Sequence, residues 1–174
     1  LYDDLSHPDL VEEVPQDCER IYVGKRAGFK AKSQEETNDL LVDRVRDGKR
    51  VVRLKGGDPY VFGRGGEEAV ALMDVDLPFE VVPGVTSGFA APAYAGIPVT
   101  HRGVATQVTL VTGHEDPTKP DSQVDWEALG KAGGTIVVYM GVGKREQYAK
   151  RLMAGGLPAD TPVAMIQWGT RPEQ

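Results

Sequence analysis

Segments typical of β-strands alternate with segments typical of α-helices along this chain, and glycine or proline marks many of the boundaries. This alternation predicts an α/β architecture with a largely parallel sheet, because each helix crosses back between neighbouring strands. The strand-like runs are residues 50–54, 79–82, 107–112, 135–139 and 162–166. The helix-like runs include residues 65–73, 126–131 and 144–154, and the small-residue segment 86–95 is also compatible with a helix that Pro92 would kink.

The clearest helix signal begins at a serine. Ser33 and Glu36 have the spacing of a capping box, in which each side chain bonds to the other residue's backbone N–H. Apolar residues at helical spacing follow, and Gly48 is expected to end the helix. A linker is expected at residues 97–100, after which the alternation of strands and helices starts again.

The overall composition narrows the class of protein. Hydrophobic residues make up 40% of the 174 residues and charged residues 26%, which is usual for a soluble globular protein. No apolar run approaches the roughly 20 residues that a membrane-spanning helix needs. The formal net charge of −6 argues against general nucleic-acid binding. We therefore expect a cytoplasmic protein with no membrane or nucleic-acid partner.

Cysteine and histidine are too sparse for several kinds of site. Cys18 is the single cysteine, so it cannot form an internal disulfide, and the three histidines are not at ligand spacing. No metal is therefore expected. The glycine fingerprint of dinucleotide-binding oxidoreductases and the phosphate-binding Walker motif are both missing. The glycines around Arg64, at residues 63–66, are expected to open a helix and not to cradle a phosphate.

Unusual loops follow three of the predicted strands. In open α/β sheets, ligands bind beyond the carboxyl ends of the strands. The first loop contains Gly56, Gly57 and Asp58; the glycines let a ligand approach the backbone, and the carboxylate can accept hydrogen bonds. The others contain the hydroxyl side chains at residues 86–87 and Met140. Each loop alone is most often an ordinary turn.

Taken together, the loops are much more specific. The motifs are, in chain order, VGKR (23–26), VRLKGGDP (52–59), FGRGGEE (62–68), VPGVTS (82–87), AYAGIP (93–98), Thr-His-Arg (100–102), VTGH (111–114) and YMG (139–141). The pair Tyr2-Asp3 and the segment at 168–170 also match. This series resembles the uroporphyrinogen-III C-methyltransferases of the tetrapyrrole methylase family, and the resemblance covers essentially the whole chain.

The resemblance implies a two-lobed fold. Each lobe is expected to hold a mostly parallel or mixed sheet with helices, at roughly residues 1–98 and 104–174. S-adenosyl-L-methionine is expected in the trough between the lobes, and the protein is expected to be a homodimer. The family begins with a strand and a Gly/Pro-rich loop before the Tyr2-Asp3 pair and continues past Gln174. The chain is therefore expected to be truncated at both ends.

The resemblance also implies an activity and its residues. The expected reaction is methylation of uroporphyrinogen III at C2 and C7, which gives precorrin-2 and S-adenosyl-L-homocysteine. Asp3 is expected to be the general base and Lys25 the proton donor. Cofactor-binding residues would be Gly56, Gly57, Asp58, Val61, Thr86, Ser87, Met140 and Gly169. Because the substrate carries eight carboxylates, a basic patch of Arg26, Arg102, Arg53 and Arg64 is expected to bind it.

Other interpretations remain open from the residues alone. Without the resemblance, Asp3 reads as a solvated loop carboxylate and Lys25 as an ordinary surface lysine. A methylase of the same fold that acts on a later corrin intermediate, or on a substrate that is not a tetrapyrrole, is one alternative. A non-catalytic fragment that keeps the cofactor-binding loops is another.

Overall fold

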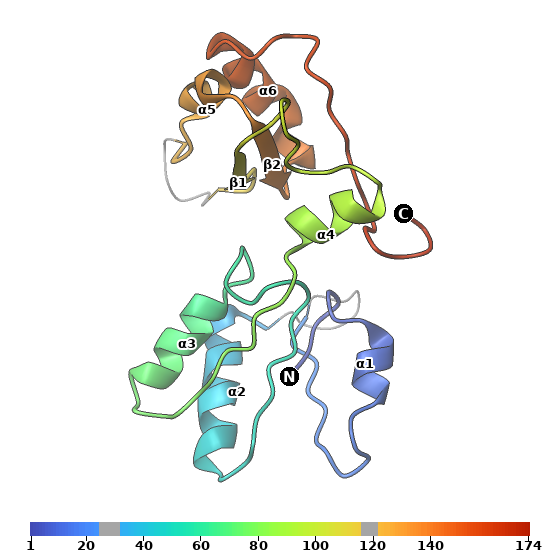
Figure 1. The fold of residues 1–174 in the computed structure, drawn as a ribbon. Helices are drawn as coiled ribbons and strands as arrows, with labels where there is room; N and C mark the ends of the chain where they lie inside the picture. The colour runs from blue at the N-terminus through green and yellow to red at the C-terminus, as the bar shows by residue number, and fades with distance from the viewer. Residues whose placement is uncertain (25–31, 116–121) are drawn as a thin grey trace. The chain divides into compact units, whose positions relative to one another are not determined.

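A computed structural model describes residues 1–24, 32–115 and 122–174 (Figure 1). The chain forms two compact units, Leu1–Thr86 and Ser87–Gln174, and each is described by itself. The expected lobe boundary between residues 98 and 104 stays a prediction.

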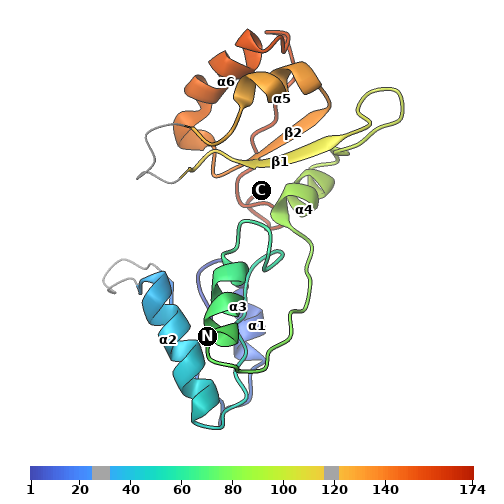
Figure 2. The ribbon, with the colours of Figure 1, turned by 90° about the vertical axis from the view of Figure 1, so that its left-hand side faces the viewer.

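Two packed helices form the centre of the first unit. Helix α2 spans Gln34–Arg46 and α3 spans Gly65–Met73, the range predicted for it. The two lie side by side (Figures 1 and 2), and Leu41, Ala69 and Leu72 are buried. Burial of such side chains is the main force that holds two helices together in water.

The ends of α2 confirm the signals read from the sequence. Ser33 accepts the N–H of Glu36, and Glu36 accepts the N–H of Ser33, so the capping box is formed. At the other end, Gly48 adopts a φ of 76° and donates to Val45, while the next residue donates to Arg44. This is a Schellman motif, in which glycine meets the left-handed conformation at little cost.

A further helix, α1 at Pro8–Glu12, was not predicted. Its N-cap is His7, whose side chain accepts the N–H of Asp9. Histidine is not among the residues that usually cap helices, although Pro8 at the first helical position and Asp9 in the first turn both favour a helix start.

The strands predicted in the first unit are wrong for its described residues. The backbone of Leu1 bonds to Val52 and Leu54, and Tyr2 forms one parallel bridge with Tyr22. Residues 50–54 and 79–82 are extended but form no ladder. β-Branched residues favour an extended backbone, but a strand also needs a continuous neighbour.

The second unit contains a parallel pair of strands, as expected for its sequence. β1 spans Val108–Thr112 and β2 spans Thr135–Tyr139, with Val108 opposite Thr135 and Thr112 opposite Tyr139. The helices are α4 at Ser87–Tyr94, α5 at Trp126–Ala132 and α6 at Arg145–Ala154, preceded by a short 3₁₀ helix at Val142–Lys144. All three α-helices were predicted to within a few residues.

The core of the second unit lies between the strands and two helices. α5 and α6 lie together over one face of β1 and β2 (Figure 2). Val111, Trp126 and Leu152 are buried there, and the Trp126 ring stacks on Tyr148 with centroids 4.9 Å apart. This packing fixes the strands and therefore the loops that follow them.

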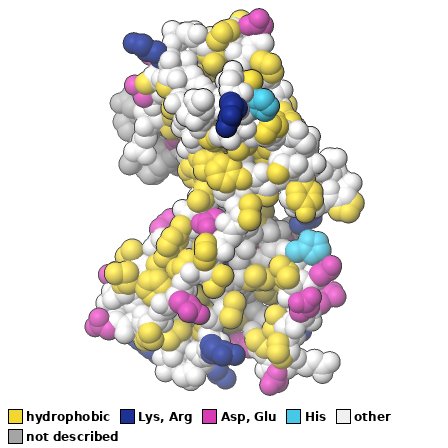
Figure 3. Space-filling model, in the orientation of Figure 1, with side chains coloured by type: hydrophobic (Ala, Val, Ile, Leu, Met, Phe, Trp, Pro, Cys, Tyr) yellow, Lys and Arg dark blue, Asp and Glu magenta, His cyan; other side chains and the backbone are white. Residues whose placement is uncertain are grey.

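Residues 162–166 form no strand in the described structure, contrary to the prediction. Val163 is 85% exposed and Val82, in the other unit, 74%. Hydrophobic side chains cover much of the visible surface of both units (Figure 3). No helix among the described residues is both long and apolar enough to cross a membrane.

Candidate functional site

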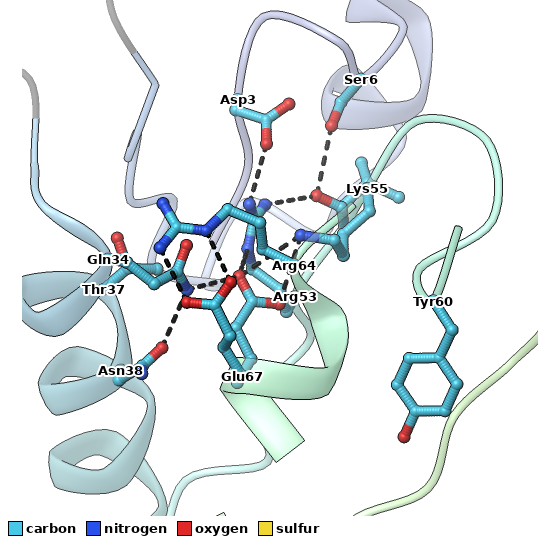
Figure 4. A network of polar contacts seen from close by, with 12 residues as sticks. Asp3, Ser6, Gln34, Thr37, Asn38, Arg53, Lys55, Tyr60, Arg64 and Glu67 are labelled. Atoms are coloured by element: carbon cyan, nitrogen blue, oxygen red, sulfur yellow. Dashed lines mark hydrogen bonds and ion pairs between the residues drawn. The ribbon is translucent and has the colours of Figure 1, made fainter. Parts of the chain in front are cut away.

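Charged side chains from distant parts of the first unit form a cluster (Figure 4). Arg53 donates from Nη2 to Asp3 Oδ2 at 2.8 Å and from Nε to Glu68 Oε1 at 3.0 Å. Lys55 Nζ lies 3.3 Å from Glu68 Oε2. Glu68 comes from α3, whereas Arg53 and Lys55 flank the end of the extended segment 50–54. The cluster thus joins two carboxylates and two cations drawn from three parts of the unit.

Asp3 is held on both carboxylate oxygens. Oδ1 accepts the N–H of Leu5 at 3.0 Å, and Oδ2 accepts Arg53. Nearby, the buried hydroxyl of Ser6 donates to the Leu54 carbonyl. The turn that carries Asp3 is therefore fixed against the segment that carries Arg53.

The same turn contacts the glycine loop. A Cβ on Gly56 would overlap the carbonyl oxygen of Leu5. Only glycine permits this approach without a shift of the backbone. The structure therefore places the predicted base, Asp3, two residues from a direct contact with the predicted cofactor loop.

Asp58 joins two of the predicted loops. Its Oδ1 accepts the N–H of Tyr60 at 2.9 Å, and its Oδ2 accepts the N–H of Gly84 at 3.1 Å. These amides, Gly84 first, hold the pKa of the Asp58 carboxyl below its ordinary value of 3.8. A Cβ on Gly84 would overlap the Gly57 carbonyl. The loops after residues 54 and 82 therefore form one connected structure, and Val61 is tied to it by a bond to the Asp58 carbonyl.

Arg64 forms a two-pronged ion pair with Glu67. Arg64 Nε and Nη2 lie 2.8 and 2.7 Å from the two Glu67 oxygens. This pair lowers the pKa of the Glu67 carboxyl. Arg64 has a φ of 58°, and α3 begins at the next residue, which confirms that this glycine-rich segment opens a helix.

Lys55 is largely enclosed within the cluster, with 10% of its side chain exposed. Burial lowers its pKa, the neighbouring Arg53 lowers it further, and Glu68 opposes both effects. Sequence reasoning missed Lys55 and Glu68 as members of the site. Both lie inside quoted motifs, but nothing local in the sequence indicates that they meet.

In the second unit, the predicted residues lie around the end of β2. Met140 follows the strand with a φ of 55° and is 59% exposed. Tyr139 accepts the N–H of Gly88, in the first turn of α4, through its hydroxyl. A Cβ on Gly113 would lie 2.5 Å from the Gly141 Cα, so the loops after β1 and β2 touch.

Gly169 lies against α4. A Cβ on it would overlap Ala91, which is on that helix. Trp168 and Thr170 both have positive φ, at 59° and 72°. Backbone strain of this kind gathers at ligand-binding and active sites. Within this unit, the structure thus brings Ser87, Met140 and Gly169 to elements that contact one another.

The remaining predicted residues are placed as follows. Thr86 is buried at the end of the first unit. Arg102 is exposed in the tight turn bridged by His101 and Ala105. Lys25 and Arg26 lie outside the described residues. Across residues 1–24, 32–115 and 122–174, no group of His, Cys, Asp and Glu side chains could hold a metal ion.

Known proteins match this chain along its whole length. The family model of the tetrapyrrole (corrin/porphyrin) methylases matches residues 1–174. The S-adenosyl-L-methionine-dependent uroporphyrinogen III methyltransferase of Methanosarcina barkeri is 55% identical over all of this chain and 68% of its own length. Siroheme synthase 1 of Yersinia pseudotuberculosis is 51% identical over all of this chain. The chain spans 36% of that longer protein.

Solved structures agree with these sequence matches. Uroporphyrin-III C-methyltransferase of Thermus thermophilus, in complex with S-adenosyl homocysteine, has a TM-score of 0.70 and 41% identity. The match covers 90% of this chain and 64% of that one. A cobalt precorrin-4 methyltransferase has a TM-score of 0.72 at 31% identity, over 89% of this chain and 62% of its own. The chain therefore has the tetrapyrrole methylase fold and belongs to the tetrapyrrole (corrin/porphyrin) methylase family.

Proposed function

We propose that this chain methylates uroporphyrinogen III at carbon, with S-adenosyl-L-methionine as methyl donor. Similarity to the Methanosarcina barkeri enzyme along the entire chain supports this activity. The structural observation that carries the proposal is the contact between the Leu5 carbonyl and Gly56, because it joins the Asp3 turn to the glycine loop. We further propose that the methyl groups go to C2 and C7, which yields precorrin-2.

The cofactor-binding residues would be those on the connected loops. Gly56, Gly57 and Asp58 lie on a loop whose glycines leave its backbone open to a ligand. When bound, S-adenosyl-L-methionine supplies an electrophilic methyl group on a sulfonium. Val61, Thr86, Ser87, Met140 and Gly169 are the other proposed contacts. Met140 offers an adaptable thioether and the hydroxyl residues offer hydrogen bonds.

The chain's own residues would handle the proton that carbon methylation releases. C2 and C7 each carry a side chain and no hydrogen, so the new C–CH₃ bond leaves a positive charge on the pyrrole. Loss of a proton from another position of the macrocycle, a neighbouring bridging carbon or a pyrrole nitrogen, neutralises that charge. Asp3 is the proposed acceptor, and the hydrogen bonds from Leu5 and Arg53, which hold its carboxylate in one orientation, support this role. Lys25 is the proposed proton donor. Arg26, Arg64 and Arg102 are proposed to bind carboxylates of the substrate by charge-assisted hydrogen bonds.

The assembly and location of the protein are also proposals. We propose a homodimer in the cytoplasm, in which the lobes comprise residues 1–98 and 104–174. Methylation of a later corrin intermediate is a second candidate function, because the cobalt precorrin-4 methyltransferase shares the fold. Its lower identity, 31% against 55% for the Methanosarcina barkeri enzyme, favours uroporphyrinogen III.

The test is anaerobic incubation of the complete protein with S-adenosyl-L-methionine and uroporphyrinogen III. Formation of precorrin-2 and S-adenosyl-L-homocysteine is expected. Asp3→Asn is expected to slow turnover by about 10²–10⁴-fold while S-adenosyl-L-homocysteine still binds. Asp39→Asn, an exposed change on α2, is the matched control and should keep full turnover.

Two results would overturn these assignments separately. Absence of methylated product with uroporphyrinogen III, combined with turnover of a later corrin intermediate, would replace the substrate. Near-full turnover of Asp3→Asn would leave the activity in place but remove Asp3 as the base.

A further inference from the structure

All three side-chain nitrogen atoms of Arg53 donate hydrogen bonds. Nη2 donates to Asp3, Nε to Glu68, and Nη1 to the Leu54 carbonyl at 2.7 Å. Its side chain is only 14% exposed. An arginine that recruits a substrate carboxylate must present a fork of donors to it. The fork of Arg53 instead faces Asp3 and Glu68, although the sequence had predicted that Arg53 binds substrate.

Glu68 fixes Arg53 from the opposite side. Its side chain is 6% exposed, and Oε1 accepts from Arg53, from Lys55 at 3.3 Å and from Gln34 at 3.4 Å. Gln34 comes from α2 and Glu68 from α3. Arg53 is therefore bonded to a buried carboxylate on α3 that is itself held by a side chain of α2.

Because Arg53 is held in place, it also fixes the carboxylate of Asp3. Its Oδ1 is held by Leu5 within the same turn, and its Oδ2 is held by Arg53. A carboxylate held at both oxygens keeps one rotamer, and two acceptor sites remain for a proton. A catalytic group that shifts by about 1 Å can lose about 10² in rate. The hydrogen bonds of the charge cluster thus hold the Asp3 carboxylate in one orientation.

We propose that Arg53 is a positioning residue, which Glu68 holds so that the Asp3 carboxylate keeps the orientation needed for proton removal. This inference rests on the proposed function of Asp3. It moves Arg53 out of the set of substrate-binding arginines. Arg26 and Arg102 stay in it, and so does Arg64, because its ion pair with Glu67 lies at the surface with 57% of the Arg64 side chain exposed. Since the donors of Arg53 are directed at Asp3, Glu68 and the Leu54 carbonyl, its loss should affect turnover more than substrate affinity.

The test compares Arg53→Gln and Arg53→Lys in the complete protein. Arg53→Gln is expected to lower kcat about 10²-fold, and both variants should change KM for uroporphyrinogen III less than threefold. Arg53→Lys keeps the charge but loses the fork, so it should recover only part of kcat. Arg44→Gln is the matched control, because Arg44 pairs with Glu19 through the same two nitrogens on an exposed surface. It should leave kcat and KM unchanged.

A double-mutant cycle separates positioning from a general structural role. Once Asp3→Asn has removed the base, Arg53→Gln has nothing left to position. The double variant is therefore expected to turn over within about threefold of Asp3→Asn alone. Independent losses that multiply would overturn the proposal, as would a raised KM with unchanged kcat in the single Arg53 variants.

Two further outcomes keep the result interpretable. If the Arg53 variants do not fold, as judged by circular dichroism, Glu68→Gln carries the same prediction of low kcat and unchanged KM; unchanged kcat there overturns the proposal. A wild-type protein that makes no product, or an active Asp3→Asn variant, would instead reject the function proposed above. The two failures are therefore distinguishable.

Discussion

The backbone N–H of Gly88 donates a 2.8 Å hydrogen bond to the hydroxyl of Tyr139. The two residues are 51 positions apart, and the bond ties the start of α4 to the end of β2. Met140 follows Tyr139 directly and Ser87 precedes Gly88. A single side chain thus holds two proposed cofactor segments at a fixed separation.

Gly88→Ala should break this arrangement. The added Cβ would overlap the Tyr139 hydroxyl, so either the ring or α4 must move. Such overpacking costs about 1–3 kcal/mol in the free energy of unfolding. Denaturant unfolding and calorimetric titration with S-adenosyl-L-homocysteine should both show a loss. Gly143→Ala is the control, since nothing lies within 4 Å of its Cβ position. Equal behaviour of the two variants would contradict the prediction.

The helices of this chain follow from local sequence, and the structure shows why. The capping box of Ser33 and Glu36 and the stop at Gly48 each depend on residues within five positions of one another. Such signals can be read directly from the chain. The α1 helix was not predicted because its N-cap is His7, and histidine is not a usual capping residue.

The strands and the site depend on distant partners. Residues 50–54 are extended as predicted, yet among the described residues only Leu1 makes backbone-to-backbone bonds with them, so no ladder forms there. The contacts of Asp3 with Arg53 and of Asp58 with Gly84 join residues 50 and 26 positions apart. The resemblance to a family predicted many of the site residues, but it did not predict that Arg53 bonds to Asp3. This contact depends on how distant segments of the chain pack together.

Asp58→Asn should weaken the link between the two loops of the first unit. An amide offers one acceptor oxygen and would place its NH₂ opposite the N–H of Tyr60 or Gly84. We expect lower affinity for S-adenosyl-L-homocysteine and a lower melting temperature at neutral pH. Asp160→Asn, in an exposed turn of the second unit, should change neither.

The effect of Asp58 should also depend on pH. Its folded-state pKa lies below its ordinary value of 3.8, so its contribution to stability is present above that value. It is lost as the pH falls through the folded-state pKa. The gap in melting temperature between wild type and Asp58→Asn should therefore shrink as the pH falls below about 4. A gap that stays constant from pH 6 to pH 2.5 would contradict this origin.

Gly84→Ala should separate the same two loops by steric means. Its Cβ would overlap the Gly57 carbonyl, which is backbone and cannot rotate away. A strain of about 1–3 kcal/mol corresponds to a loss of S-adenosyl-L-homocysteine affinity of roughly 5- to 150-fold if it falls on the bound state. Gly66→Ala, inside α3 with open space around its Cβ position, should bind normally and melt at the same or a higher temperature. Normal binding by Gly84→Ala would show that the loops do not form the cofactor site.

Arg102→Gln should distinguish a substrate arginine from the positioning role inferred for Arg53. Arg102 is exposed in the turn between His101 and Ala105, and the described part of the chain forms no salt bridge with it. Its guanidinium is therefore available to an anionic substrate. Loss of one charge-assisted hydrogen bond costs about 1.5 kcal/mol at the lower end, so KM for uroporphyrinogen III should rise roughly tenfold with kcat nearly unchanged. Because exposed charges are screened by salt, the difference in KM between Arg102→Gln and wild type should narrow at high ionic strength.

Arg151→Gln, which removes an exposed arginine paired with Glu127, is the matched control and should leave KM unchanged. A fall in kcat at constant KM for Arg102→Gln would place this arginine with the catalytic support and not with substrate binding.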